Sequence, residues 1–179
     1  NEGIIVSVGH RNASYIEATH FFTTIHVATH LFNAMSPMHH REPGLPAAVL
    51  LNPSVRCSIV PDGYHVDFAM IELAKKLMGE RLFYITDAVT ETKTGPYSHV
   101  LKGDKYESNG ILSGSALTMM KAVENGVKKC NISLEESLKM ASLYPAKVLG
   151  IDNERGKIKP GYKACLVLID EEFTVVDCI

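Results

Sequence analysis

The sequence has almost no excess charge and no long apolar run, and each absence argues against a class of protein. Its 18 Lys and Arg nearly balance its 20 Asp and Glu, giving a formal net charge of −2. This balance, with no long basic run, argues against nucleic acid or an anionic membrane surface as the main partner. No stretch approaches the roughly 18 consecutive apolar residues of a membrane span. No basic-then-apolar leader opens the chain, so no signal peptide is expected.

Cysteine is also scarce. The four cysteines, Cys57, Cys130, Cys165 and Cys178, are scattered and form no CxxC pair, so neither a thiolate zinc site nor a dithiol redox motif is indicated. A reducing cytoplasm is the expected compartment. A hydrophobic content of 46% with 21% charged residues is ordinary for a globular protein and argues against a collagen-like or disordered chain. The first residue, Asn1, is not methionine, so we expect a piece of a longer protein.

Four apolar runs each end at polar residues and are followed by a helical pattern. The runs cover residues 4–8, 25–32, 55–60 and 82–86. Near-continuous apolar strands that alternate with helices are typical of a parallel sheet covered by helices. Polar residues at the carboxyl end of each strand are typical of a (β/α) barrel, whose active site is built by the loops after the strands. A complete barrel has eight units, so these four predict an α/β fold that is half of a (β/α)8 TIM-type barrel.

Helices are expected between these strands and over much of the second half. The first is capped by Asn12 or Ser14 and runs to about residue 22, and the others span about residues 45–51, 66–78, 115–129 and 133–144, with a short one from Pro145 towards Gly150. In the helix at 66–78 the apolar stripe includes Leu73 and Leu77, with Lys75 outside it. Ser133 and Glu136 have the spacing of a capping box.

The remaining segments have β character. Residues 97–112 predict a hairpin insertion with turns at Gly103-Asp104 and Asn109-Gly110. Residues 164–169 and 174–176 predict two strands of a small C-terminal β segment. We therefore interpret residues 1–150 as a partial barrel that forms the catalytic domain, and residues 151–179 as strands of an accessory β layer.

Two histidines follow successive strands and could meet at a metal ion. His10 and His30 each lie where a predicted strand ends, and neutral imidazole is a common metal ligand. Either histidine alone more often has a structural role. Because both lie at matching strand ends, a metal-binding role and a structural role carry equal weight for the pair. We assign His26 to a strand with a structural role, and the pair His39-His40 to a solvated loop.

Acidic and basic side chains at the other strand ends suggest further chemistry. Asp87 ends the fourth strand and could act as a metal ligand or a general acid and base, or simply cap a helix. Asp62 and His65 follow the third strand, and His65 could polarise a carbonyl group or bind an anion. Arg41 has the fork geometry that grips phosphate, although a loop arginine is more often merely solvated. The start of the helix after residues 112–115 could offer N–H donors.

Six motifs occur in the order in which a known family carries them. They are Gly9-His10-Arg11-Asn12-Ala13, Ala28-Thr29-His30-Leu31-Phe32-Asn33-Ala34-Met35, Arg41-Glu42-Pro43-Gly44, Asp62-Gly63-Tyr64-His65-Val66-Asp67, Thr86-Asp87-Ala88 and Leu112-Ser113-Gly114-Ser115-Ala116-Leu117-Thr118-Met119. The sequence resembles the N-acetylglucosamine-6-phosphate deacetylase family of the amidohydrolase superfamily. The likeness continues to the tail and covers nearly the whole chain.

The resemblance implies a divalent-metal hydrolase, usually with zinc, that removes acetate from N-acetyl-D-glucosamine 6-phosphate. His10 and His30 would be metal ligands, and Asp87 would deprotonate the metal-bound water and then protonate the leaving amine. His65 would steady the acetamide carbonyl or the substrate. The implied substrate-binding residues are Asn33, Ala34 and Arg41 for the phosphate, Leu112, Ser113 and Gly114 for the sugar, and Asp62, Gly63, Tyr64 and His65.

The chain departs from the family in its extent. The family's third protein ligand, an acidic residue, comes from an earlier strand than any present here, so the chain corresponds to the C-terminal half of the barrel. With two ligands in place of three, we expect weak or absent metal binding and no useful deacetylase activity from this chain alone. Two open sheet edges and an apolar inner face predict association, most simply as a homo-oligomer.

Two other functions remain open at this stage. One is another amidohydrolase that acts on a cyclic or N-acyl amide, such as a dihydroorotase-like enzyme or an amino-acid deacetylase. The other is a non-catalytic module that binds a sugar phosphate, which would keep the region around Asn33 and Arg41 but would not need Asp87.

Overall fold

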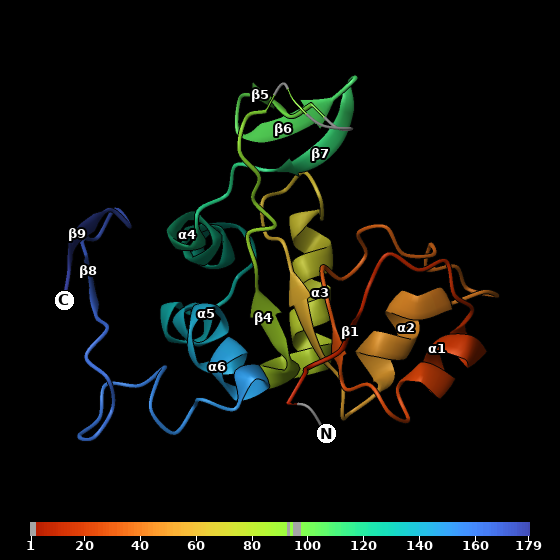
Figure 1. The fold of residues 1–179 in the computed structure, drawn as a ribbon, viewed down its shortest axis with the longest axis horizontal. Helices are drawn as coiled ribbons and strands as arrows, with labels where there is room; N and C mark the ends of the chain where they lie inside the picture. The colour runs from red at the N-terminus through yellow and green to blue at the C-terminus, as the bar shows by residue number, and fades with distance from the viewer. Residues whose placement is uncertain (1–2, 93, 95–97) are drawn as a thin grey trace.

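A four-stranded parallel sheet forms the centre of the molecule. The computed structural model describes residues 3–92, 94 and 98–179. The strands lie in chain order, and they are β1 (Ser7–Val8), β2 (Val27–Ala28), β3 (Arg56–Ile59) and β4 (Leu82–Tyr84) (Figure 1). All pairs are parallel, as predicted, although each strand is shorter than the apolar run that predicted it. Because the strands are parallel, the polar residues that follow them share one edge of the sheet.

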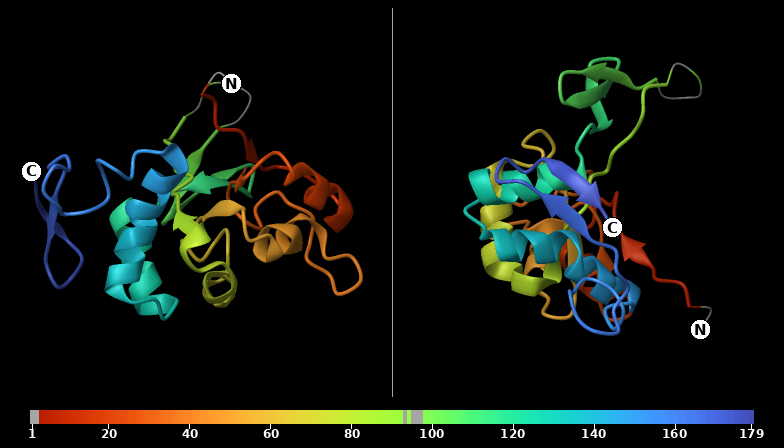
Figure 2. Two further views of the ribbon diagram at one scale, coloured as in Figure 1. Left: turned by 90° about the horizontal axis from the view of Figure 1, so that it is seen from below. Right: turned by 90° about the vertical axis from the view of Figure 1, so that its left-hand side faces the viewer.

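Helices follow one another around one side of the sheet (Figure 2). Three lie between the strands, and they are α1 (Tyr15–Phe21), α2 (Gly44–Leu51) and α3 (Phe68–Met78). Ser14 and Glu17 form a complete capping box at the start of α1, because each side chain accepts a hydrogen bond from the other residue's backbone N–H. The core lies between these helices and β2 to β4, where Leu45, Ile59 and Leu82 are fully buried.

The buried face of α3 differs from the predicted one. Leu73 and Leu77 are 40% and 48% exposed, and the fully buried positions are Ile71 and Ala74. Lys75 is not a solvated residue, because its amino group pairs with the Glu136 carboxylate and donates to the carbonyl oxygen of Gly79. The face with Ile71 and Ala74 is buried because the small side chain of Ala74 permits close packing and the ion pair gives Lys75 a partner.

The predicted hairpin is a three-stranded antiparallel meander, here called the meander and defined as residues 98–115. Its strands are β5 (Val100–Lys102), β6 (Lys105–Ser108) and β7 (Ile111–Ser115), joined by both predicted turns. Asn109 and Gly110 have φ of 51° and 79°, the left-handed pair that a tight two-residue turn requires. Tyr97, the predicted start of the hairpin, lies outside the described residues. Because β7 continues to residue 115, the next helix starts later than predicted.

The second half adds three helices and a separate ribbon. The helices are α4 (Met119–Lys129), α5 (Leu134–Ala141) and α6 (Leu143–Leu149), and the ribbon pairs β8 (Val167–Ile169) with β9 (Val175–Cys178). The capping box predicted before α5 is only half formed. Ser133 accepts from the N–H of Glu136, but the Glu136 carboxylate turns to Lys75 and Tyr144. Among the described residues no helix is long and apolar enough to cross a membrane.

A single arginine ties α2 and α3 together at the end of the sheet where the strands begin. Arg81 closes the short 3-10 turn η1 (Gly79–Arg81), and its guanidinium donates to four carbonyl oxygens within 3.2 Å. These acceptors are Leu50 at 3.1 Å, Asn52 at 2.7 Å, Val55 at 3.0 Å and Leu77 at 3.2 Å. The last carbonyls of a helix lack partners within it, so Arg81 satisfies the ends of both helices.

Replacement of this arginine tests its structural role. We expect Arg81→Met to lower the free energy of unfolding by about 2–4 kcal/mol, because charge-assisted hydrogen bonds to partly buried carbonyls are lost. The matched control is Arg56→Met, whose guanidinium makes one long bond, 3.3 Å to Glu80 O, and which should cost under about 1 kcal/mol. Urea denaturation followed by circular dichroism measures both. Equal losses for the two variants would contradict the assignment.

Candidate active site

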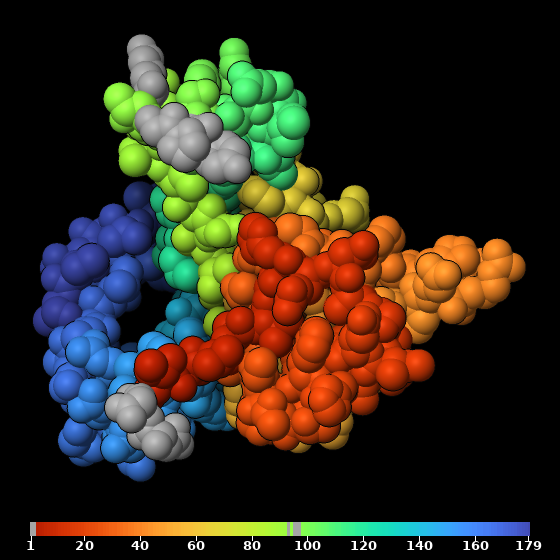
Figure 3. Space-filling view, turned by 45° about the vertical axis from the view of Figure 1, so that its right-hand side comes forward, coloured from red at the N-terminus to blue at the C-terminus, as the bar shows by residue number. Residues whose placement is uncertain are grey.

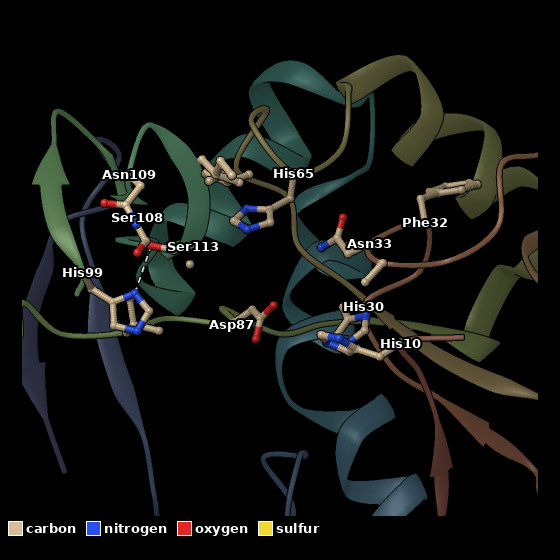
Figure 4. Close-up of a pocket in the computed structure, with 15 residues that line it drawn as sticks. His10, His30, Phe32, Asn33, His65, Asp87, His99, Ser108, Asn109 and Ser113 are labelled. Carbon is tan, nitrogen blue, oxygen red and sulfur yellow. Dashed lines mark hydrogen bonds between the residues drawn. The ribbon is translucent and has the colours of Figure 1, made fainter. Parts of the chain in front are cut away.

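A cavity of about 750 Å³ lies at the edge of the sheet where the strands end. Its lining comes from the strand ends and from the meander (Figure 4). The lining residues are His10, His30, Phe32, Asn33, Ala34, His65, Asp87, Val89, His99, Ser108, Asn109, Ile111, Leu112, Ser113 and Gly114. The cavity therefore brings together the ends of all four parallel strands, as the barrel layout predicts.

The two histidines predicted as metal ligands lie side by side. The ring centroids of His10 and His30 are 4.6 Å apart and the ring planes meet at 76°. Both residues have left-handed backbone, with φ of 49° and 39°. Gly9 makes room for this arrangement, since a Cβ there would lie 2.6 Å from Thr29 Cγ2 and 3.1 Å from His30 Cε1. A side chain at position 9 would displace the Thr29 side chain and press against the His30 ring.

The His30 ring is buried, and one of its nitrogens has no hydrogen-bond partner among the described residues. Its residue is 6% exposed, and among the described residues its Nδ1 has no partner. Its backbone is well held, because the His30 N–H donates to Ser58 Oγ at 2.9 Å. A buried imidazole nitrogen without a partner is costly in an apo protein and fits a ring that serves a metal ion. In the part of the chain that the structure describes, no group of three or more His, Cys, Asp or Glu could hold a metal.

His65 is fixed by Asp62. The Asp62 carboxylate contacts His65 Nδ1 at 2.6 Å and accepts the backbone N–H groups of Tyr64 and His65 at 2.9 and 2.8 Å. Burial by itself raises the pKa of Asp62, but the hydrogen bonds from His65 and from both N–H groups outweigh it and hold the pKa below its ordinary value. An ionised carboxylate only accepts, so the proton is on Nδ1 of His65. In the tautomer that carries only this proton, Nε2 of His65 is an acceptor on the cavity side.

Asp87 is held by the meander through its backbone. The N–H of Ser115 donates to the carbonyl oxygen of Asp87 at 3.1 Å, and the buried Ser115 hydroxyl donates to that of Thr86. Asp87 has φ of 49° and an exposed side chain in the cavity. Residues 88–92, which directly follow Asp87, are not helical, so the alternative prediction of a helix cap is wrong. Its carboxylate is available for proton transfer.

The structure gathers only part of the predicted substrate-binding set. Asn33, Ala34, His65, Leu112, Ser113 and Gly114 line the cavity with Asp87 and the two histidines. The Asn33 Nδ2 donor is buried without a partner among the described residues and faces the cavity. The residues not in the lining are Arg41, Asp62, Gly63 and Tyr64. Arg41 belongs to the loop between β2 and α2, which projects from the body of the molecule (orange in Figure 3).

Several lining residues were not predicted from the sequence. They are Phe32, Val89, His99, Ser108, Asn109 and Ile111. The most polar of these is His99, whose Nδ1 lies 2.9 Å from Ser113 Oγ. No spacing in the sequence pairs His99 with the strand ends, because it enters the cavity through the folding of the meander. The prediction of a sugar-lining segment at 112–114 was the only available signal.

Comparison with known proteins identifies the family of this chain. The model of the family described as "Amidohydrolase family" matches residues 1–178. The chain belongs to the amidohydrolase family. It is 34% identical over 189 residues to the N-acetylglucosamine-6-phosphate deacetylase of Haemophilus influenzae, with 99% of this chain and 49% of that protein covered.

Other relatives of this amidohydrolase differ in the sugar that their names carry. The N-acetylgalactosamine-6-phosphate deacetylase of Escherichia coli O157:H7 is 32% identical, over 94% of this chain and 47% of that protein. The crystal structure of N-acetylglucosamine-6-phosphate deacetylase from Pasteurella multocida superposes with a TM-score of 0.93 at 37% identity, over 99% of this chain and 49% of that one. The chain thus spans about half the length of these relatives.

The Asp62–His65 pair gives a pH-dependent prediction. We expect Asp62→Asn to lower the free energy of unfolding by about 1–2 kcal/mol at neutral pH, because the partly buried His65 donor loses its carboxylate. A lowered pKa in the folded state stabilises the fold above the ordinary value of 3.8, and this stabilisation is lost as the pH falls through the lowered pKa. The difference between wild type and variant should therefore shrink below about pH 3.8.

Circular dichroism in urea at each pH measures this difference, since the chain has no tryptophan. The control is the same substitution in a His65→Phe background. There the cost of Asp62→Asn should be smaller, because the side-chain donor is already absent. An equal cost in both backgrounds would show that His65 does not hold the carboxylate.

Proposed function

We propose that this chain forms the C-terminal half of a (β/α)8 barrel hydrolase that converts N-acetyl-D-glucosamine 6-phosphate to D-glucosamine 6-phosphate and acetate. The observation that carries the proposal is one cavity lined by His10, His30, His65 and Asp87, each from the end of a different parallel strand. The names of the relatives from Haemophilus influenzae and Pasteurella multocida support this substrate. Residues 1–150 then form the partial catalytic domain, and residues 151–179 belong to an accessory β layer.

Metal binding is proposed for His10 and His30. The buried Nδ1 of His30, which has no partner within the described ranges, and the contact of its ring with that of His10 fit a divalent cation, with zinc as the first choice for imidazole ligands. A bound divalent metal lowers the pKa of water and polarises a carbonyl oxygen, which is the chemistry that amide hydrolysis needs. Structural and catalytic zinc sites use at least three protein ligands, so the missing one must come from outside the described residues.

Asp87 is proposed as the group that moves the proton. Its carboxylate accepts a proton from the attacking water and returns it to the amide nitrogen as the carbon–nitrogen bond breaks. Without this second transfer the departing amine would be an anion, a poor leaving group. The backbone contacts from Ser115 hold the Asp87 backbone, while its exposed side chain is free to face both oxygen and nitrogen.

His65 and Asn33 are proposed to orient the substrate. Asp62 holds the Nδ1 proton of His65, so Nε2 accepts a hydrogen bond from a substrate hydroxyl or, where it also carries a proton, donates one to the acetamide oxygen. The buried Asn33 amide offers a donor to the phosphate, and Ala34 places its backbone beside it. Arg41 remains a proposed phosphate contact. This contact requires the Arg41 loop to lie over the cavity of its own chain or of another copy of the chain.

Association of chains is also proposed. Exposed apolar side chains precede β1, where Ile4, Ile5 and Val6 are 74%, 47% and 56% exposed, and β1 and β4 are the open edges of the parallel sheet. Unpaired edges and apolar surface favour pairing with another chain. Sedimentation velocity of the 179-residue chain tests this, and a strictly monomeric species would contradict it.

A chimera tests the proposed function directly. In it, this chain replaces the matching half of the Pasteurella multocida enzyme, whose fold it shares. We expect the chimera to release acetate from N-acetyl-D-glucosamine 6-phosphate, and Asp87→Asn to lower kcat by about 10²–10⁴-fold because proton transfer is lost. Asp104→Asn, an exposed acid in a turn of the meander, is the matched control and should keep full activity.

Two outcomes would overturn this function. A folded, metal-loaded chimera without acetate release would refute the deacetylase. Normal turnover by the Asp87→Asn chimera would refute the acid–base assignment and favour a module that only binds a sugar phosphate. Faster turnover of a cyclic amide than of the phosphorylated sugar would favour a dihydroorotase-like enzyme.

Zinc content gives an independent prediction. The chimera should hold zinc tightly, and His10→Ala or His30→Ala should lower the metal content after dialysis about tenfold or more, because each removes a ligand. His39→Ala and His40→Ala are the controls, since these rings also lie together, 4.1 Å apart, but outside the cavity. The 179-residue chain alone should bind zinc with a dissociation constant above about 1 μM, because solvent completes its shell. Tight binding by that chain would contradict the need for a third ligand.

A further inference from the structure

The cavity contains polar side chains that take no part in the proposed metal binding or proton transfer. On the meander side these are His99, Ser108, Asn109 and Ser113. In Figure 4 they lie apart from His10 and His30, and Asp87 lies between the two groups. A substrate whose amide is at Asp87 would extend its ring towards one of these sides. The meander side therefore offers hydrogen bonds at a distance from the reacting amide.

His99 is the best-fixed member of this group. Its backbone N–H and carbonyl oxygen pair with Thr92 at 3.0 and 3.1 Å, and its Nδ1 lies 2.9 Å from the hydroxyl oxygen of Ser113. The two backbone hydrogen bonds to Thr92 fix the position of His99, and the contact with Ser113 of β7 fixes the orientation of its ring. Nε2 is the ring nitrogen that these contacts leave for a ligand. A fixed ring with one remaining polar atom is suited to distinguishing positions of a hydroxyl group.

The meander is itself held in register with Asp87. Ser115 donates its N–H to Asp87 O and accepts the N–H of Val89 at 3.2 Å. Gly114 permits this close approach, since a Cβ there would lie 2.7 Å from both methyl carbons of Val89. His99 and the proposed proton-transfer group therefore belong to one connected unit. The spacing between them is set by the fold and not by a free loop.

We infer that His99, held by Ser113, hydrogen-bonds a ring hydroxyl of the amino sugar and makes the site selective between hexosamine 6-phosphates that differ at that hydroxyl. The inference rests on the proposed function. The relatives carry the names of both N-acetylglucosamine and N-acetylgalactosamine 6-phosphate deacetylases at similar identities, 34% and 32%, so overall identity does not set this choice. The two sugars differ only in the configuration of the C4 hydroxyl. A site that pairs one hydroxyl position leaves a polar group unpaired with the other sugar.

Steady-state kinetics of the chimera with both sugar phosphates tests the inference. We expect His99→Phe to raise KM for N-acetyl-D-glucosamine 6-phosphate about tenfold, as for the loss of one hydrogen bond, with kcat within about threefold. The value of kcat/KM for N-acetyl-D-galactosamine 6-phosphate should change by less than about threefold. The ratio of the kcat/KM values for the two sugar phosphates should therefore fall. Ser113→Ala frees the ring and should cause a smaller change in the same direction. His99→Gln keeps a polar side-chain end and should recover part of the loss.

The control is His20→Phe, which makes the same change at an exposed position on α1 outside the cavity and should leave both substrates unaffected. Circular dichroism melting separates unfolding from loss of selectivity, and His99→Gln and Ser113→Ala still decide the matter if His99→Phe fails to fold. Unchanged KM and unchanged preference in folded His99 variants would overturn the inference. That result, with a chimera that still depends on Asp87, would leave the proposed function intact.

Discussion

The site depends on left-handed backbone placed directly after three of the four parallel strands. His10, His30 and Asp87 have φ of 49°, 39° and 49°, values that residues other than glycine rarely adopt. Each such residue costs about 1–3 kcal/mol, so it persists only where its surroundings determine it. In exchange, the chain turns sharply at the end of the strand while the side chain faces the cavity. The proposed metal ligands and the proton-transfer group thus share one left-handed backbone conformation.

Buried hydroxyl groups stabilise these turns. Ser58 Oγ accepts the N–H of His30 and lies 3.1 Å from Thr29 Oγ1, and Ser115 binds the carbonyl oxygens of Thr86 and Asp87. Ser58 and Ser115 are 1% and 0% exposed, so water cannot replace them as partners. A buried backbone group without a partner would add to the cost of the left-handed conformation. The register of β3 against β2, and of β7 against the segment after β4, therefore fixes the site geometry.

The sequence was informative where one local rule determines the structure. Parallel strand order and the positions of the strand ends followed from apolar runs, and the Asn109-Gly110 turn followed from its residue types. The buried face of α3 was not predictable, since Leu73 and Lys75 exchange their expected environments once Glu136 and Tyr144 are packed nearby. His99 was missed for a related reason, because only the pairing of the meander brings it to a cavity built by distant strand ends.

Stability and chemistry occupy opposite ends of the same sheet. Arg81 joins the ends of α2 and α3 where the strands begin, and Lys75, Glu136 and Tyr144 join α3 to α5 and α6. The strained residues lie where the strands end, as do His30 Nδ1 and Asn33 Nδ2, which have no partner in the part of the chain that the structure describes. The free energy that the strained backbone costs at the site must be offset elsewhere. The contacts between the helices are therefore part of what permits strained residues at the strand ends. Loss of these contacts should therefore lower the free energy of unfolding without altering which residues face the cavity. Loss of a proposed metal ligand should change the cavity without lowering the free energy of unfolding.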